Sequence, residues 1–309
     1  MERLFRAAVT DAPPWTLLLA SPRYPVRLRH IADPPVLLYV RGQVRPEEPA
    51  VAIVGSRRAT ATGRLVTERL AAGLAERGVT VVSGLARGID AVAHRAALDA
   101  GGRTIAVLGC GVDLVYPPEH AELAAAIARS GCVLTELPPG TPPLPHHFPR
   151  RNRLIAGLAL GVVVVEGDER SGALSTAASA LNEGREVMAT PGSVLNPLTR
   201  APHALLRQGA TLVESAEEVL AAVGLPVEPG DPIGPAGPME QPEGVAALVW
   251  QAVGTEPTHI DEVVDGSGLP AAEVAALLIE LELRSLVRPL PGKHFIRVWR
   301  ASVRQRHDP

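Results

Sequence analysis

The chain of 309 residues is long enough for one large domain or two, and its 46% hydrophobic content is ample for a sizeable core. A charged fraction of 20% and a mean hydropathy of +0.15 exclude a generally disordered chain. The sequence has no uncharged apolar run that could span a bilayer, residues 1–14 lack the apolar segment of a signal peptide, and two cysteines cannot supply a disulfide framework or a four-ligand zinc site. We therefore expect a globular protein of the cytoplasm without a metal.

Charge is distributed unevenly along the chain. Residues 1–224 carry 23 arginines, no lysine and 21 acidic residues, whereas residues 225–309 carry 7 basic and 12 acidic residues. This balance offers no overall basic surface to a nucleic acid, so any nucleic-acid site must be local. The nine aromatic residues also argue against an extended base-stacking platform.

Residues 1–50 are rich in proline, and we expect them to pack on the core as an extension with a short edge strand near Val36–Val40. From residue 51 to residue 223, short and continuous apolar runs alternate with helical patterns, which is typical of a parallel sheet buried on both faces. The predicted strands are Val51–Val54, Val79–Val82, Thr104–Leu108, Cys132–Thr135, Val162–Glu166, Glu186–Ala189 and a weaker Ala210–Val213. The predicted helices are Thr62–Arg77, Gly88–Ala100, Pro118–Ser130, Asn152–Leu160 and Ala173–Gly184. This alternation predicts an α/β domain with a doubly wound, mostly parallel sheet.

A linker rich in proline and glycine, residues 224–241, separates this domain from the last part of the chain. Helical patterns follow at Glu243–Val253, Thr258–Asp265 and Pro270–Leu283, then two strands around a turn at residues 291–293. This order predicts a small winged-helix domain over residues 242–300, with a tail at 301–309. Its third helix contains three glutamates and no basic residue, so we expect it to contact protein rather than to read duplex DNA.

Short turns rich in small residues follow several predicted strands. In a doubly wound sheet, ligands bind beyond the carboxyl ends of the strands, where glycines let backbone N–H groups converge on an anion. The turns are Gly55-Ser56-Arg57, the run from Ser83 to Gly88, Gly109-Cys110-Gly111 and Ser171-Gly172. One such turn is as typical of a tight strand-to-helix connection as of a ligand site. Several at one edge, two of them with an arginine, favour a row of phosphates.

Arginines support the same prediction. Arg57 and Arg87 follow the first two strands, and Arg150, Arg151 and Arg153 stand at the start of a predicted helix. Positive side chains at a helix N-terminus are unfavourable with the helix dipole, and a bound anion would relieve the repulsion. A solvated charge cluster is the alternative explanation.

Catalytic chemistry has weaker support. The histidines lack the spacing of metal ligands, and no serine lies in a G-x-S-x-G turn. Glu136 and Glu166, at strand ends, are the best candidates for a catalytic carboxylate. We expect His94 to be packed within a helix and Asp90 to pair with Arg87, three residues earlier. The sequence thus favours a binding protein over an enzyme, with no nucleotide cofactor.

Four stretches carry a specific family pattern: Val51-Ala-Ile-Val-Gly-Ser-Arg57, Val82-Ser-Gly-Leu-Ala-Arg-Gly-Ile-Asp-Ala-Val-Ala-His94, Phe148-Pro-Arg-Arg-Asn-Arg-Leu-Ile-Ala-Gly157, and Val164-Val-Glu166 followed by Ser171-Gly-Ala-Leu-Ser-Thr176. They resemble the bacterial DNA-processing protein A family (DprA/Smf), from about Tyr24 through the winged helix. The resemblance implies an extended Rossmann fold that binds single-stranded DNA (ssDNA). It also implies loading of the RecA recombinase onto that DNA during natural transformation and recombination, usually by a homodimer.

Carried over position by position, the resemblance implies an ssDNA site with a base stacked on Phe148. Because backbone turns and arginines contact phosphates rather than base edges, we expect binding without sequence preference. The remaining residues of the site are Gly55, Ser56, Arg57, Gly84, Arg87, Gly88, Arg151, Asn152, Arg153, Ser171 and Gly172.

The chain departs from the family pattern in places. The 23 residues before Tyr24 are too few for the helical SAM-like domain of many members, and Thr62, His120 and Ala201-Pro202-His203 replace the usual residues. Two alternatives stay open. One is a nucleoside-monophosphate phosphoribohydrolase of the LOG type on a related Rossmann scaffold, although its P-G-G-x-G-T-x-x-E motif has no match here. The other is a regulator that binds duplex DNA through the winged helix.

Overall fold

The computed structural model describes residues 14–227, 242–284 and 286–297. The chain divides into two compact units, residues 1–229 and 230–309, and each is described by itself. The division falls within the predicted linker, of which residues 228–241 lie outside the described residues, as does the predicted tail at 301–309. The limits of the predicted segments stay predictions.

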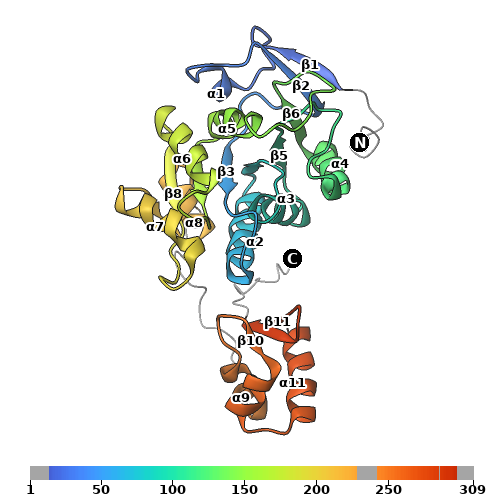
Figure 1. The fold of residues 1–309 in the computed structure, drawn as a ribbon, viewed down its shortest axis with the longest axis vertical. Coiled ribbons are helices and arrows are strands. Elements are labelled where there is room, and N and C mark those ends of the chain that lie inside the picture. The colour runs from blue at the N-terminus through green and yellow to red at the C-terminus, as the bar shows by residue number, and fades with distance from the viewer. Residues whose placement is uncertain (1–13, 228–241, 285, 298–309) are drawn as a thin grey trace, which may run out of the picture. The chain divides into compact units, whose positions relative to one another are not determined.

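The first unit is built on a nine-stranded sheet in the order β1-β2-β6-β5-β4-β3-β7-β8-β9 (Figure 1). The strands from β3 to β9 pair in parallel, and β1 and β2 form an antiparallel extension beside β6. The strands are β1 (Trp15–Leu18), β2 (Leu37–Gly42), β3 (Ala50–Val54), β4 (Thr80–Ser83), β5 (Thr104–Val107), β6 (Cys132–Thr135), β7 (Gly161–Val164), β8 (Glu186–Ala189) and β9 (Thr211–Leu212). The predicted doubly wound, mostly parallel α/β sheet is confirmed.

Helices connect the parallel strands. The helices are α1 (Val26–Arg29), α2 (Ala61–Glu76), α3 (Ile89–Asp99), α4 (Ala121–Ser130), α5 (His147–Leu158), α6 (Gly172–Asn182), α7 (Arg200–Arg207) and α8 (Ala216–Ala222), with short 3-10 turns η2 (Pro118–His120) and η3 (Pro197–Thr199). The side chain of Thr60 caps α2 by accepting the N–H of Gly63, and Ser171 caps α6 in the same way from Ala173.

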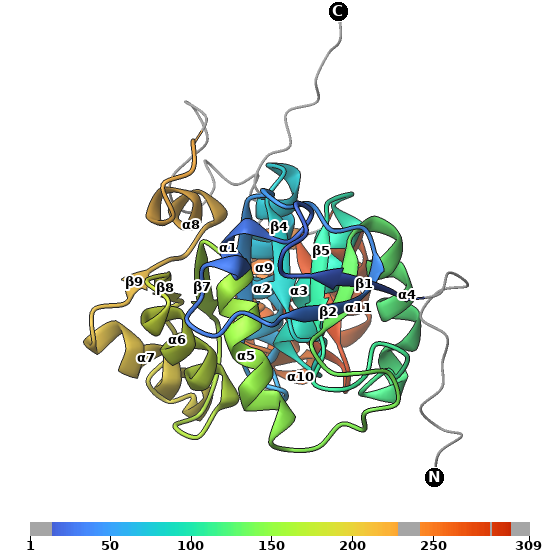
Figure 2. The same cartoon turned by 90° about the horizontal axis from the view of Figure 1, so that it is seen from above.

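The direction of the chain across the sheet reverses between β3 and β7. Strands β3 to β6 follow one another toward one edge, and β7 to β9 continue from the other side of β3. Alternate residues of β3 therefore meet different helices: Ala50, Ala52 and Val54 pack with α5 and α6, whereas Val51 and Ile53 pack with α2 and α3. Helices α5 and α6 lie side by side on their face of the sheet (Figure 2).

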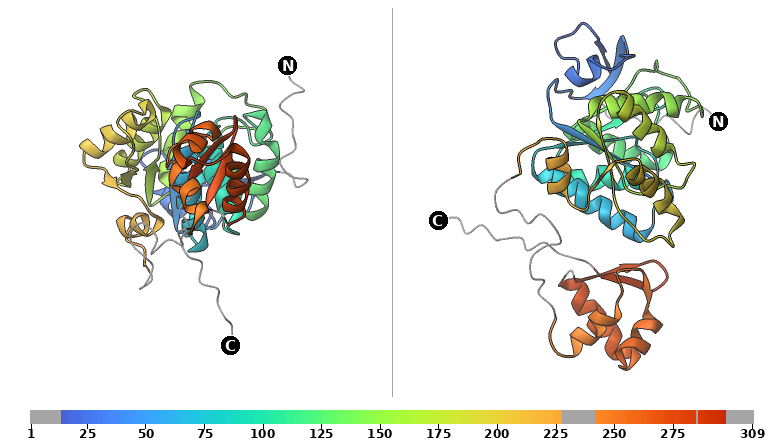
Figure 3. Two further views of the ribbon diagram at one scale, coloured as in Figure 1. Left: turned by 90° about the horizontal axis from the view of Figure 1, so that it is seen from below. Right: turned by 90° about the vertical axis from the view of Figure 1, so that its left-hand side faces the viewer.

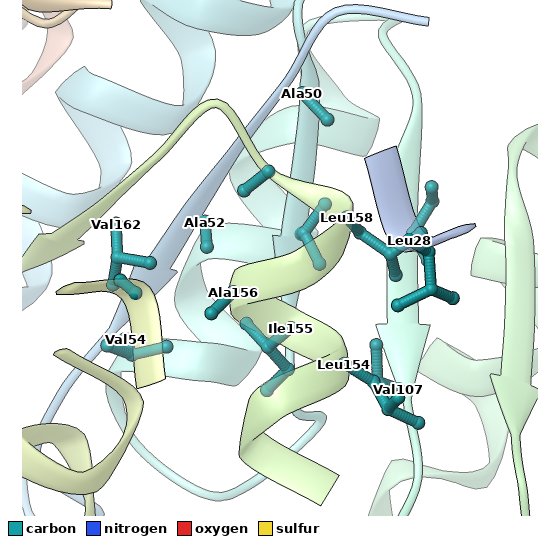
Figure 4. Close-up of a cluster of buried hydrophobic side chains, with 14 of the residues drawn as sticks. Leu28, Ala50, Ala52, Val54, Val107, Leu154, Ile155, Ala156, Leu158 and Val162 are labelled. Carbon is teal, nitrogen blue, oxygen red and sulfur yellow. The ribbon is translucent and has the colours of Figure 1, made fainter. Parts of the chain in front are cut away.

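Helix α5 fills the centre of the larger core cluster. Figure 4 shows Leu154 of α5 beside Val107 of β5, and both side chains are fully buried. At Gly157 the helix meets the N-terminal extension, because an added Cβ would lie 2.7 Å from Ile31 and 2.9 Å from Leu28. The extension thus packs on α5.

Three parts of the first unit differ from the prediction. The predicted edge strand lies inside the sheet, because β1 covers the outer side of β2. Strand β1 is missed: it stands at the edge of the sheet, and only Leu17 of its four residues is buried, unlike the fully buried parallel strands beside β3. Helix α5 begins at His147 rather than Asn152, since a proline at position 149 is tolerated in a first turn, where backbone N–H groups have no intrahelical partner. The short helices α1, α7 and α8 are also missed.

The second unit has its own core and the winged-helix order. Helices α9 (Val245–Ala252), α10 (Ile260–Ser267) and α11 (Ala271–Leu283) pack with a three-stranded sheet of β10 (Thr258–His259), β12 (His294–Arg297) and β11 (Val287–Leu290), coloured orange to red in Figure 3. Thr258, predicted to start a helix, lies in β10, because it pairs with Phe295 of the wing. Across the described stretches of both units, every helix is too short or too polar to cross a membrane.

Replacing Leu154 with alanine tests the packing of α5 against the sheet. The fully buried side chain would leave a cavity, so we expect the free energy of unfolding to fall by about 2–5 kcal/mol. Chemical denaturation followed by circular dichroism measures the change. The control is Leu181→Ala on α6, whose side chain is 59% exposed, and which should cost less than about 0.5 kcal/mol. Equal losses in the two variants would contradict the packing described here.

Candidate functional site

A cleft of about 610 Å³ opens beyond the carboxyl ends of β3 and β7. Its walls are the loop after β3, the segment that leads into α5, and the first turns of α5 and α6. The cleft contains eight of the predicted site residues: Gly55, Ser56, Arg57, Phe148, Arg151, Asn152, Ser171 and Gly172. We call it the switch-point cleft, because it lies where the sheet reverses direction, the usual ligand position in this class of fold.

The charge of the lining favours an anion. Arginines 57, 58, 151 and 170 line the cleft, against aspartates 90 and 168. The N-terminus of α6 adds positive partial charge at the same place. At Gly172, the first residue of that helix, an added Cβ would meet no heavy atom of the described residues within 4 Å. A phosphate could therefore approach the backbone of this turn closely.

Arg57 and Phe148 form one wall of the cleft. The guanidinium carbon of Arg57 lies 5.6 Å from the centre of the Phe148 ring. The ring of Tyr116 also lies beside it, with ring centres 5.7 Å apart. The ring rests on Gly109, where a Cβ would lie 2.9 Å from it. Arg57 is exposed, so its charge is held at the cleft by the aromatic face while its N–H groups stay open to solvent.

Arg151 lies at the floor of the cleft and is buried. Its Nη1 donates to the carbonyl oxygen of Gly84 at 2.8 Å and to that of Val107. A Cβ at Gly84 would lie 2.4 Å from the guanidinium, so any larger residue there would displace Arg151 from this position. Burial lowers the pKa of Arg151 to about 10, an effect opposed by the charge of Asp90, and the side chain is still protonated at neutral pH. Arg151 thus holds α5 against the loop after β4.

Asp90 belongs to the same buried group. Its carboxylate accepts the N–H groups of Gly84 at 3.1 Å and Ala86 at 3.3 Å. Burial raises its pKa, and the charge of Arg151 opposes the rise. The predicted pair with Arg87 is wrong, because Asp90 points into the turn that precedes its own helix.

Glu136 pairs with two of the three arginines that the sequence analysis placed at a helix start, Arg150 and Arg153, which lie within α5. It contacts Arg150 at 3.2 Å and Arg153 at 2.5 Å, and Arg153 also donates to the backbone oxygen of Asp33 at 2.5 Å. A carboxylate of the chain itself therefore balances the charges of Arg150 and Arg153, a role for which the sequence had suggested a bound anion. Arg153 lies outside the lining that the described residues give the cleft.

The remaining predicted residues, Gly84, Arg87 and Gly88, also lie outside that lining. Arg87 pairs with Glu119 at 2.5 Å, and both side chains are about half exposed. Gly88 has φ of +75°, and a Cβ there would lie 2.2 Å from the carbonyl oxygen of Ser56. This close approach brings the loops after β3 and β4 together.

Several lining residues are absent from the prediction. Arg58 and Arg170 each stand beside a predicted residue, and their charge was the signal that could have identified them. Tyr116, Pro143 and Pro145 come from segments outside the predicted strands and helices, so only the folded chain brings them to the cleft.

The carboxylates that the sequence offered as catalytic candidates lie outside the cleft and contact other residues. Glu166 accepts the N–H and hydroxyl of Thr60 at 2.9 and 2.5 Å, and a Cβ at Gly63 would lie 2.3 Å from its carboxyl carbon. His94 is buried as predicted, with Nδ1 2.6 Å from the hydroxyl of Thr104, and burial lowers its pKa to about 3. Among the described residues that line the cleft, neither Glu136 nor Glu166 is present.

Comparison with known proteins agrees with this geometry. The family model for DNA recombination-mediator protein A matches residues 15–224, and that for the DprA winged helix domain matches residues 234–293. Protein Smf of Escherichia coli is 42% identical over 284 residues, which cover 90% of this chain and 76% of the relative. DNA processing protein DprA of Streptococcus pneumoniae is 48% identical over 199 residues, 64% of this chain and 70% of the relative.

Two solved structures of DprA proteins are also similar to this chain. The X-ray structure of DprA from Streptococcus pneumoniae has a TM-score of 0.64 at 43% identity and covers 71% of this chain and 76% of that one. A structure of DNA processing protein A from Helicobacter pylori, determined to show its single-stranded DNA binding mode, has a TM-score of 0.62 at 28% identity and covers 68% of this chain and 95% of that one. The chain belongs to the DNA recombination-mediator protein A (DprA/Smf) family.

Proposed function

We propose that the switch-point cleft binds the phosphates of single-stranded DNA without sequence preference. The observation that carries the proposal is the exposed guanidinium of Arg57, held on the face of Phe148 opposite the open N-terminus of α6. Arginines and backbone N–H groups contact phosphates, which are common to every sequence. The structural relative from Helicobacter pylori binds single-stranded DNA, which supports the same ligand here.

Single strands fit this cleft better than duplex. Phe148 is half-buried beside the arginines and offers part of its ring to an unstacked base, a contact that all four bases can make. A blunt duplex keeps its bases stacked inside, so it would gain only phosphate contacts. The second unit does not favour duplex either, since α11 presents glutamates 273, 280 and 282 on its exposed surface.

We propose that this binding serves the loading of RecA onto single-stranded DNA in transformation and recombination, by a cytoplasmic homodimer. The family description as a recombination mediator supports this role.

We also propose that the cleft binds DNA without catalysing a reaction. In support, Glu136 and Glu166, the best candidates for a catalytic carboxylate in the sequence, are engaged by Arg153 and Thr60.

Arg57→Ala is expected to weaken ssDNA binding and to reduce the slope of log affinity against log salt by about 0.7, the value for one neutralised phosphate on a single strand. Arg57 is exposed, so the melting temperature should not change. Gel-shift titrations of an oligothymidylate at several salt concentrations give the affinity and the salt slope, and thermal denaturation gives the melting temperature. Arg129→Ala removes the same charge from the exposed end of α4 and should leave the salt slope near its original value. A lower melting temperature with an unchanged salt slope would show that Arg57 stabilises the fold and does not contact DNA.

Glu119→Gln should raise ssDNA affinity. The Glu119 carboxylate now holds Arg87 and would compete with a phosphate for it. Removing that carboxylate frees the guanidinium, so the salt slope should rise by about 0.7 as one more phosphate is neutralised. Glu122→Gln, an exposed change of equal charge on α4, is the matched control. Equal affinities for these two variants would place Arg87 outside the DNA path.

Deleting residues 242–309 should leave most ssDNA affinity intact, because the second unit has a separate core and the cleft is lined by the first unit alone among described residues. The truncated and full-length proteins are compared by titration with the same oligonucleotide. A loss of more than about tenfold, or 1.4 kcal/mol, would assign DNA contacts to the winged helix.

A further inference from the structure

Two apolar side chains stand out on the surface of the first unit. Val194 is 85% exposed and Leu195 is 90% exposed, the highest values for large hydrophobic residues among those the structure describes. Both lie in the loop of residues 190–199, which leaves the carboxyl end of β8 and ends with the 3-10 turn η3. Two neighbouring aliphatic side chains with this exposure hold apolar surface in water, and burying that surface against a ligand would be favourable.

Hydrogen bonds on both sides of the tip hold this loop in place. The hydroxyl of Thr199 donates to the backbone oxygen of Ser193 at 2.8 Å, and the side-chain oxygen of Asn196 accepts the N–H of Leu198 at 2.9 Å. The amide nitrogen of Asn196 also donates to Glu166 at 3.4 Å. The loop thus presents its two apolar side chains from a fixed base.

The base of this loop adjoins the switch-point cleft. Strand β8 pairs with β7, so the two following loops are neighbours at the same edge of the sheet. The N–H of Gly167 donates to the backbone oxygen of Leu198 at 2.6 Å, and a Cβ at Gly167 would lie 2.7 Å from the hydroxyl of Ser171 in the cleft wall. One residue therefore separates the loop from the lining.

We propose that Val194 and Leu195 form an apolar prong that packs against nucleobases of the strand whose phosphates lie in the switch-point cleft. The proposal rests on the ssDNA function proposed above. Arg170 in the cleft provides positive charge beside this loop, whereas the charge of Arg200 is balanced by Glu169 at 3.1 Å. With phosphates held by charge, the bases of a single strand are left to solvent. An aliphatic pair can cover a base face or wedge between two bases, whatever the sequence.

The test compares DNA with and without bases. The double variant Val194→Ser/Leu195→Ser and the wild-type protein are titrated with an oligothymidylate and with an abasic oligomer of the same length and charge. We expect the double variant to lose about tenfold in affinity for the oligothymidylate, the size of one lost base contact. Its affinity for the abasic oligomer and its salt slope should stay unchanged. Leu195→Phe should bind the oligothymidylate more tightly than the wild type.

The control is Val36→Ser, which removes an exposed apolar side chain, 70% accessible, from outside the cleft lining and should change neither affinity. Equal losses on both oligomers, or no loss on either, would overturn the prong. So would a change in sedimentation with unchanged DNA binding, because the pair would then meet a second copy of the chain. Wild-type protein that binds neither oligomer would contradict the ssDNA function itself. Equal wild-type affinities for the two oligomers would contradict both the prong and the base contact of Phe148, while the phosphate contacts of the cleft would stand.

Discussion

The reversal of chain direction between β3 and β7 is the constraint on which the site depends. Because the connections from these two neighbouring strands lead to opposite sides of the sheet, no single helix covers both of their carboxyl ends. The loop after β3 and the first turn of α6 therefore face each other across an opening, and α5 supplies the third wall. The cleft follows from the topology, and the side chains determine what it can bind.

Residues of the motifs that identify the family have two roles: some shape the cleft, and others are open to a ligand. Gly84, Asp90 and Arg151 form a buried group in which the glycine makes room for a guanidinium that holds two backbone oxygens. Gly88 lets two loops touch. These residues set the shape of the cleft, whereas Arg57 and the turn at Gly172 are open to a ligand. A pattern can thus be specific to a family for reasons of packing as much as of binding.

The parallel part of the sheet was predictable because its strands are short, continuous apolar runs, several of them followed by a turn of small residues. The position of the cleft was predictable too, since strand order in this class of fold places such turns at one edge. The roles of individual arginines were not. Arg153 depends on Glu136, and Arg87 on Glu119, which is 32 positions away in the chain. Such pairs form only when distant segments fold together, so the sequence shows the charge but not its partner.

The exposure of Val194 and Leu195 could not be predicted from the sequence either. Nothing in the order of residues 193–196 distinguishes an exposed aliphatic pair from a buried one, since Val and Leu are typical of cores. Their exposure follows from the hydrogen bonds of Ser193, Asn196 and Thr199, which turn the chain outward at the tip. Glu166 accepts hydrogen bonds from two separate segments, from Thr60 before α2 and from Asn196 in the loop. The carboxylate that resembled a catalytic group thus connects the start of α2 to the loop beside the cleft.

Amide hydrogen exchange of the full-length chain, with and without an oligothymidylate, tests the central claim most directly. If the strand lies in the switch-point cleft, exchange should slow at residues 55–58 and 168–175, on the two facing sides of the opening. The second unit and the outer surfaces of α2 and α3 should exchange as before. Slower exchange confined to those helices or to the winged helix, with the two cleft segments unaffected, would contradict the account.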